Sequence, residues 1–133
     1  MKIHYIKKIE GSPVVQFVAE AWCALMKHGQ WDKTSVLIGS ELQCVYATVG
    51  KRTVGCLTFH IDGSYSTVNC AYVVPAFRSK GVYQKMHERF VELSRQQSAT
   101  SVLNICYPSN EGIQAACKKL GYLPYTITLK LAL

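Results

Sequence analysis

The chain reads Val73-Val74-Pro75-Ala76-Phe77-Arg78-Ser79-Lys80-Gly81-Val82-Tyr83 where a strand-like run gives way to a helix-like one. Pro75 cannot continue a strand ladder, and the residues after Gly81 have the apolar period of a helix. The first N–H groups of a helix have no partners within it, and the helix dipole adds partial positive charge there. Gly81 leaves the backbone open, and Arg78 and Lys80 add formal charge. The turn therefore predicts a phosphate or pyrophosphate site; a plain strand–helix turn with solvated cations is the alternative.

Hydrophobic periodicity predicts the elements on both sides of this turn. Strands are expected around Lys2–Ile9, Leu42–Val49, Thr53–Ile61, Ser66–Val74, Val102–Tyr107 and Tyr125–Leu131. Helices are expected from a Ser12 N-cap to Gly29, from about Gly81 to Gln97, and from Asn110 to about Leu120, where Gly121 ends the helix. The segment from Trp31 to Glu41 gives no clear prediction. The order is β-α-βββ-α-β-α-β, which is a mixed α/β sandwich forming one domain over residues 1–133.

The composition narrows the class of protein. Hydrophobic residues make up 49% and charged residues 17%, enough apolar material for a core. The sequence has no apolar run long enough for a membrane span or a secretory signal. We therefore expect a cytoplasmic protein that does not associate with a membrane. The six cysteines lack CxxC or zinc-site spacing and are expected to be reduced core thiols, with disulfide bonding as the less favoured interpretation. The formal charge of +7 fits a nucleic acid, an acidic protein surface or a polyphosphate cofactor.

Two motifs together resemble those of one known family. The pattern Val73-x-Pro75-x-x-Arg78-x-x-Gly81-Val82 resembles the acyl-CoA motif of the GNAT superfamily of N-acyltransferases. The later segment Asn110…Leu120-Gly121-Tyr122 resembles the fourth helix of that family, and the predicted element order is similar over nearly the whole chain. The glycine-rich dinucleotide fingerprint is missing. The resemblance implies a mixed sheet that splays at the CoA-binding strand, and an N-acetyltransferase that uses acetyl-CoA as its cofactor.

The resemblance also implies which residues bind the cofactor. Val73 matches the position whose backbone bonds the pantetheine arm, where two parallel strands splay apart. Arg78, Ser79, Lys80, Gly81, Val82 and Tyr83 match the pyrophosphate loop, which acts mainly through backbone N–H groups. Asn110 matches a side chain that contacts the pantetheine or phosphate region. Ser79 stands where glycine is commonest, which is harmless if its φ is negative. Tyr83 stands where glycine or alanine is commonest, so its ring is expected to shape the pocket or cover the cofactor.

The catalytic base follows the family pattern less closely. The position of the usual carboxylate falls near Thr67, and Ser66–Val74 contains no Asp or Glu. His60 is a candidate base because its reference pKa suits neutral pH. Asp62 is a weaker candidate because it sits in a turn, and His28 and His87 are expected to be exposed on helices. Asn69 could orient a water, and Tyr72 could touch the acyl group, although a core aromatic role is favoured for it. Proximity alone accelerates such a reaction, so a missing base does not exclude activity.

The catalytic acid also departs from the family. A Tyr commonly stands seven residues after the Asn and protonates the leaving thiolate, and Cys117 takes that place here. Cys117 is either the proton donor, with a reference pKa of about 8.5, or core filler on a stripe with Ile113 and Leu120. Helical periodicity slightly favours core filler.

Three functions are compatible with these features. The first is an N-acetyltransferase that acts on a small-molecule or protein amine by direct attack. The second is a nucleic-acid-directed relative, which the cations Lys7, Lys8, Lys51 and Arg52 suit although no nucleic-acid motif occurs. The third is a non-catalytic CoA-binding or interaction module, favoured by the missing carboxylate and Tyr. The specificity for the acceptor is expected to lie in loops, here Gly29–Ser40, Asp62–Tyr65 and Pro124, whose sequences do not reveal the acceptor. The oligomeric state is open.

Overall fold

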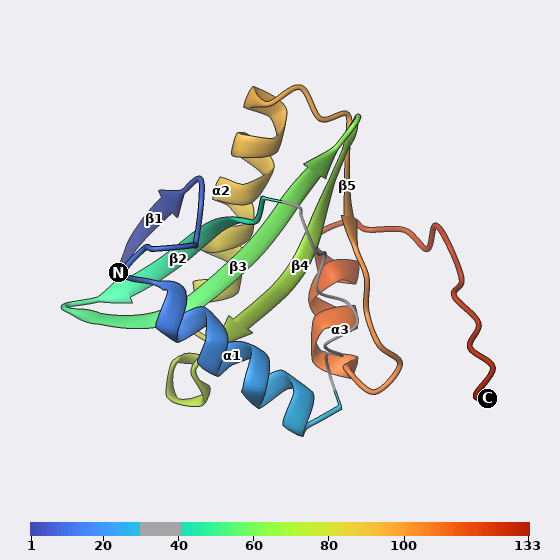
Figure 1. Cartoon of the computed structure of the whole chain (residues 1–133), viewed down its shortest axis with the longest axis horizontal. Helices are drawn as coiled ribbons and strands as arrows, with labels where there is room; N and C mark the ends of the chain where they lie inside the picture. The colour runs from blue at the N-terminus through green and yellow to red at the C-terminus, as the bar shows by residue number, and fades with distance from the viewer. Residues whose placement is uncertain (30–40) are drawn as a thin grey trace.

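A single mixed sheet lies at the centre of the computed structural model, which describes residues 1–29 and 41–133 (Figure 1). Its five strands lie side by side in chain order. They are β1 (Lys2–Ile6), β2 (Gln43–Val49), β3 (Arg52–Asp62), β4 (Tyr65–Val73) and β5 (Ser101–Asn104). Neighbours from β1 to β4 are antiparallel, whereas β5 runs parallel to β4. This change of direction requires a crossover between β4 and β5, and it leaves β5 at an edge of the sheet.

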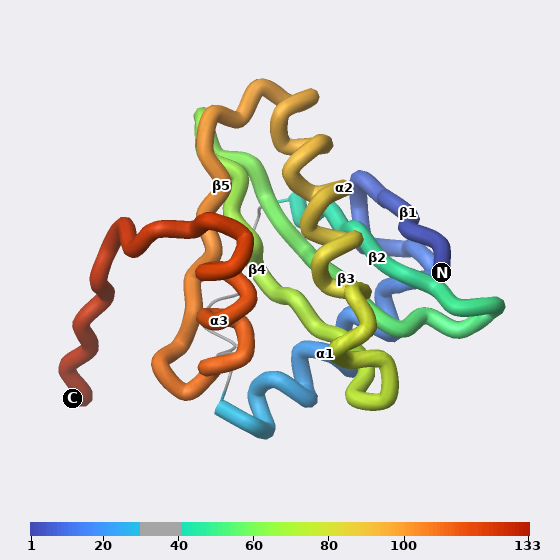
Figure 2. The backbone as a smooth tube through the Cα atoms, turned by 180° about the vertical axis from the view of Figure 1, so that it is seen from behind, coloured from blue at the N-terminus to red at the C-terminus, as the bar shows by residue number. Residues whose placement is uncertain are grey.

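Helices cover both faces of the sheet. Helix α1 (Val15–Lys27) lies in front of it in Figure 1, and α2 (Val82–Gln96), the crossover between β4 and β5, lies behind it. Helix α3 (Glu111–Lys119) follows β5 and lies on the same side as α2, as the view from behind shows (Figure 2). A short 3₁₀ turn at Pro75–Phe77 joins β4 to α2. The predicted mixed α/β class is therefore confirmed, as are the three helices and the first five strands.

Two apolar layers hold α1 and α2 on the sheet. Phe59 of β3 meets Phe90 of α2 edge to face with ring centroids 5.0 Å apart, and Met86 is fully buried beside them. Helix α2 approaches β3 so closely that a Cβ at Gly55 would lie 3.1 Å from Met86 Cε. On the other face, Val18 of α1 packs against Cys44. The turn that follows β4 is thus anchored by a rigidly packed helix.

Several predicted boundaries were wrong by a few residues. Strand β1 ends at Ile6, and α1 begins at Val15 without a side-chain cap. Ser12 is not the N-cap, because its hydroxyl donates to the Ile9 carbonyl and stabilises a turn before the helix. Gly29 does end α1, with φ +66° and its N–H bonded to the Met26 carbonyl. The segment from Trp31 to Glu41 gave no clear prediction, and its residues up to 40 lie outside the described residues.

The last predicted strand, Tyr125–Leu131, is not formed. These residues have no regular secondary structure and leave the body of the molecule beyond α3 (Figures 1 and 2). Their large apolar side chains are 68% to 89% exposed at Tyr125, Ile127, Leu129 and Leu131. The alternating pattern is typical of a strand, but a strand also needs a partner edge for its hydrogen bonds.

Candidate active site

The parallel strands β4 and β5 diverge halfway along β4. They pair from Tyr65 opposite Ser101 to Val68 opposite Asn104, where β5 ends. Strand β4 continues to Val73 and pairs there only with β3 among the described residues. From Asn69 to Val73, the edge of β4 on the β5 side therefore has no strand partner among the described residues, at the splay predicted from the sequence.

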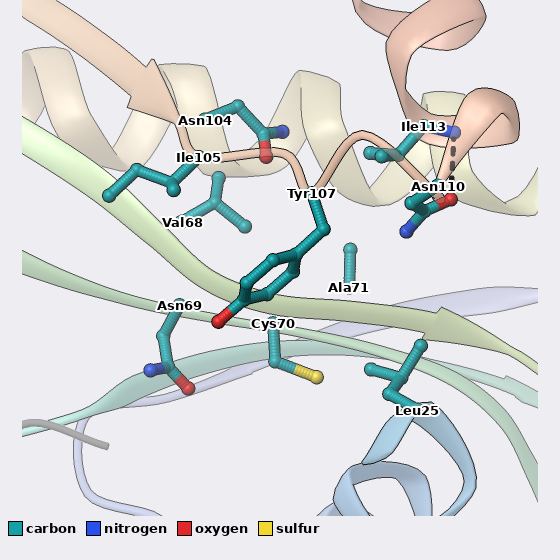
Figure 3. A pocket seen from close by; sticks show the side chains of 10 residues that line it. All are labelled: Leu25, Val68, Asn69, Cys70, Ala71, Asn104, Ile105, Tyr107, Asn110 and Ile113. Atoms are coloured by element: carbon teal, nitrogen blue, oxygen red, sulfur yellow. Dashed lines mark hydrogen bonds between the residues drawn. The ribbon is translucent and has the colours of Figure 1, made fainter. Parts of the chain in front are cut away.

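A pocket lies at this splay, between the diverging strands and the ends of α1 and α3 (Figure 3). It collects residues from three parts of the chain that are distant in sequence. The lining residues are Leu25, Val68, Asn69, Cys70, Ala71, Asn104, Ile105, Tyr107, Asn110 and Ile113. None of these ten described residues carries a charge, so the pocket suits a neutral chain better than an ion.

A β-bulge places Asn69 in this pocket. Thr58 of β3 faces Cys70 and Phe59 faces Val68, which leaves Asn69 as the extra residue of β4. The Thr58 hydroxyl donates to Asn69 Oδ1 over 3.0 Å and fixes the orientation of the amide. Asn69 was a weak candidate from sequence because a bulge leaves no clear mark in an apolar run.

Asn110, predicted to contact the cofactor, begins α3 and lines the pocket. Its Oδ1 accepts a hydrogen bond of 3.3 Å from the Ile113 N–H, so the side chain caps the helix. Figure 3 shows the amide nitrogen on the pocket side. Asn110 therefore caps α3 with its amide oxygen and presents its amide nitrogen, a hydrogen-bond donor, to the splay.

Tyr107 is a pocket residue that the sequence did not single out as functional. It was expected at the end of a strand, but β5 stops at Asn104 and Tyr107 stands in the following loop. Figure 3 shows its ring crossing the pocket with the hydroxyl turned towards Asn69. The Tyr107 carbonyl accepts hydrogen bonds from the Asn110 N–H and from Gln114 Nε2, both 2.9 Å long. These bonds tie the loop to α3 and hold the ring in place.

The predicted pyrophosphate loop forms the exposed N-terminus of α2. Gly81 is the N-cap with φ +80°, no side chain caps the first turn, and that turn contains no acidic residue. A Cβ at Gly81 would meet nothing within 4 Å, so the backbone here is accessible from solvent. An uncapped helix start with exposed Arg78 and Lys80 beside it fits an anionic group.

Ser79 and Tyr83 differ from expectation. Ser79 has φ +60°, so its backbone is in the left-handed region that favours glycine. The negative φ under which serine would be harmless here is therefore not observed. Tyr83 does not lie over the loop, because its ring packs against the core and its hydroxyl accepts a 3.2 Å hydrogen bond from Asn104 Nδ2. Burial raises the pKa of this phenol strongly. Tyr83 thus braces β5 where it leaves β4.

Arg78 links the loop to the end of β4. Its Nε–H donates to the Val73 carbonyl over 2.8 Å, and its guanidinium lies 5.5 Å from the Tyr72 ring centroid. The Val74 N–H bonds to the Val54 carbonyl, so the alternation of an antiparallel ladder turns the Val73 N–H away from β3. The structure therefore joins Val73 and the loop, and it presents the Val73 backbone to the splay.

Cys117 lies in a cluster between α3 and α2 rather than in the pocket lining. It is 6% exposed, and burial, followed by the neighbouring Cys106, raises the pKa of its thiol to about 12. Nearby, His87 was expected to be exposed but is 6% exposed, because its Nε2 meets the Tyr122 hydroxyl at 2.7 Å. The predicted exposure of His87 was wrong because α3 and Tyr122 cover that side of α2. His28 is exposed, as expected.

His60 stands on β3 opposite Thr67 of β4, outside the pocket lining. Burial lowers the pKa of its imidazole, and the carboxylate of Asp62 partly opposes this effect. Its Nδ1 is buried without a hydrogen-bond partner among the described residues. The lowered pKa favours the neutral imidazole of His60, while Thr67, at the position of the family carboxylate, is buried and has no carboxyl group.

The family model of the GNAT acetyltransferases matches residues 15–122. This match spans both strands of the splay, the loop and α3. The chain belongs to the GNAT acetyltransferase family. No curated protein matches its sequence closely enough to narrow this further.

Solved structures share the fold at low sequence identity. A ribosomal-protein-alanine N-acetyltransferase from Brucella melitensis biovar Abortus 2308 is 10% identical with a TM-score of 0.78, and 99% of each chain is covered. The aminoglycoside acetyltransferase meta-AAC0020 from an uncultured soil metagenomic sample, in complex with sisomicin, is 10% identical with a TM-score of 0.77; 99% of this chain and 95% of that chain are covered. The aminoglycoside N-acetyltransferase AAC(6')-Iy in complex with CoA is 16% identical with a TM-score of 0.69, and 98% of each chain is covered.

Other kinds of site find little support in the described part of the chain. Residues 1–29 and 41–133 hold no group of three or more Cys, His, Asp or Glu that could bind a metal ion. All six cysteines are free thiols. Within the same residues, no helix combines the length and the apolar character that crossing a membrane requires. Arg52, one of the cations that suited a nucleic acid, and Lys80 of the candidate phosphate loop each lie 5.4 Å from the Phe77 ring centroid.

Proposed function

We propose that this GNAT chain is an N-acetyltransferase that moves an acetyl group from acetyl-CoA to an amine by direct attack. The observation that carries the proposal is the divergence of β4 and β5 beside the uncapped start of α2. An anionic group at the loop and a thin, neutral arm in the splay match the two chemical halves of CoA. The complex of AAC(6')-Iy with CoA supports this choice of co-substrate for the family.

In this proposal the loop residues Arg78, Ser79, Lys80, Gly81, Val82 and Tyr83 hold the pyrophosphate, mainly through backbone N–H groups. The uncapped helix start supplies donors and partial positive charge, and Gly81 leaves room for a phosphate. Val73 and Asn110 flank the splay and would bind the pantetheine arm. The hydrogen bond from Arg78 to the Val73 carbonyl fixes the spacing between the pyrophosphate loop and the pantetheine-binding end of β4.

The chemistry needs an attacking amine, an oxyanion donor and a path for one proton. The amine nitrogen forms a bond to the thioester carbonyl carbon, the carbon–sulfur bond breaks, and one amine proton must leave. The Val73 N–H, which points away from β3, would stabilise the oxyanion. His60 would accept the proton through water, since its lowered pKa favours the neutral imidazole that can take one up. Asn69 would orient such a water from its fixed amide.

Cys117 is the second proposed catalytic group, and the geometry supports it less. Its raised pKa keeps the thiol protonated at neutral pH, as a proton donor requires. However, the thiol is buried and is not among the residues that line the pocket. We therefore favour a packing role for Cys117, with the departing thiolate taking its proton from water.

The test is the release of CoA from acetyl-CoA over a panel of small amines, peptide α-amines and peptide lysines. The proposal predicts saturable release with at least one class, at rates above those without an amine. Binding of acetyl-CoA without release for any amine would favour a second candidate, a non-catalytic CoA-binding module. That candidate is supported by the missing carboxylate among the ten described pocket residues.

A further inference from the structure

The loop between β5 and α3 carries Tyr107 into the splay pocket and is fastened to two helices. On the α3 side, Gln114 Nε2 donates to the Pro108 carbonyl over 3.2 Å, in addition to its bond to the Tyr107 carbonyl. On the α1 side, the Ser109 hydroxyl donates to the Gly29 carbonyl over 2.9 Å. The backbone that carries the Tyr107 ring is therefore held from both sides.

The ring itself closes an apolar recess in the pocket. It packs against Leu25 of α1 and Cys70 of β4, which are both buried. Figure 3 shows the ring lying across the pocket, with its hydroxyl on the side of Asn69. Without the ring, the apolar side chains of Leu25 and Cys70 would form a recess that is open to the splay.

The recess lies on the path of an acyl chain. In the proposed function, on which this inference rests, the CoA arm enters beside α2 and places its thioester carbonyl at Val73. The edge of β4 without a strand partner runs from there back to Asn69 and passes Cys70, against which the Tyr107 ring packs. Three residues of strand separate Val73 from Cys70, which corresponds to about 10 Å. An acetyl group is too short to reach the ring, whereas each added methylene brings the end of an acyl chain closer to it.

We propose that Tyr107 determines the length of the acyl chain that the site accepts, because its ring closes the recess beside Leu25 and Cys70. In an open apolar recess, each methylene that a chain buries would raise its affinity about fourfold. With the ring in place, a long chain finds no apolar surface to bury against and gains nothing over a short one. Tyr107 thus selects short acyl groups by the bulk of its ring and not through its hydroxyl.

Titration calorimetry with acetyl-CoA and octanoyl-CoA tests the proposal and needs no turnover. The wild-type protein should bind octanoyl-CoA no more tightly than acetyl-CoA. Tyr107→Ala should shift the ratio of the two Kd values by at least about tenfold in favour of octanoyl-CoA, and Tyr107→Phe, which keeps the ring, should retain the wild-type ratio. Tyr46→Ala is the matched control, because Tyr46 is also a half-buried ring in an apolar cluster with α1 but does not line the pocket. It should leave the ratio unchanged.

A cooperative thermal melt checks the fold of each variant. If Tyr107→Ala does not melt cooperatively, Tyr107→Leu takes its place, and the ratio should then shift by at least about fourfold, the gain from one buried methylene. A wild-type preference for octanoyl-CoA, a smaller shift than stated, an equal shift in Tyr46→Ala, or a shift in Tyr107→Phe would each overturn the proposal. If neither acyl-CoA binds, the proposed function fails and this inference fails with it. Binding of acetyl-CoA without the effect of chain length refutes the role of Tyr107 alone.

Discussion

At the scale of single residues, two left-handed backbone positions shape the candidate phosphate loop. Gly81 has φ +80° and Ser79 has φ +60°. The role of Gly81 could be predicted from sequence, because a glycine before an amphipathic helix is a common turn signal. The conformation of Ser79 could not, since serine gives no sign that its backbone will be left-handed. No side chain caps the helix start, and the surroundings of Gly81 are open.

Replacing Gly81 by valine tests the loop. The valine Cβ branches would stand where we place the pyrophosphate, so the Kd for CoA measured by titration calorimetry should rise by about tenfold or more, equivalent to one lost charge-assisted hydrogen bond. Gly11→Val is the matched control, because Gly11 has φ +72°, equally open surroundings and no place in the loop. Both variants should lose about 1–2 kcal/mol of unfolding free energy from backbone strain. Equal CoA affinity in the two variants would refute the loop assignment.

Cys117→Ala separates the two roles of Cys117. With a packing role, the variant should lose about 1 kcal/mol of unfolding free energy from a small cavity and keep its turnover. With an acid role, turnover should fall by about 10² or more while CoA binding is kept. Cys44→Ala is the control, because Cys44 is also a buried thiol but lies against α1. Cys117→Tyr should be destabilised by overpacking, and full activity in it would contradict the packing role.

At the scale of elements, the contact between α2 and the end of α3 was the one that sequence did not foresee. His87 and Tyr122 are 35 residues apart, and His87 looks like a surface residue in its own helical pattern. Periodicity describes one element at a time, so it finds the face turned to the sheet but not the side that a later element covers. The same limit explains why Tyr107 was expected in a strand and lies in the pocket.

This contact predicts a pH dependence of stability. Burial lowers the pKa of His87, so the proton binds the unfolded chain more tightly than the folded one. The contribution of His87 to the unfolding free energy should therefore be largest above its pKa in the unfolded chain, about 6.5. It should decrease as the pH drops from there towards the lower pKa of His87 in the folded protein. His87→Gln should make the decline between about pH 7 and 5 shallower in denaturant titrations, and His28→Gln, at an exposed position, should leave it unchanged. A steeper decline in His87→Gln would contradict this sign.

At the scale of the whole molecule, the sequence predicted the class, the first five strands and the three helices, because each has a clear period bounded by a turn signal. The pocket depends on where β5 leaves β4 and on the bulge at Asn69, and both are set by pairing between strands. The segment after α3 shows the opposite case. Its pattern is as clear as that of any strand, yet it pairs with no strand among the described residues, so pattern alone could not predict its structure.

A crystal structure with acetyl-CoA bound tests the central claim most directly. It should show pyrophosphate oxygens within hydrogen-bond distance of backbone N–H groups between residues 79 and 83. The pantetheine arm should pass between β4 and β5, beside Val73 and Asn110, and the thioester carbonyl should face the Val73 N–H. Acetyl-CoA held elsewhere on the molecule, or with its pyrophosphate away from the start of α2, would contradict the proposed site.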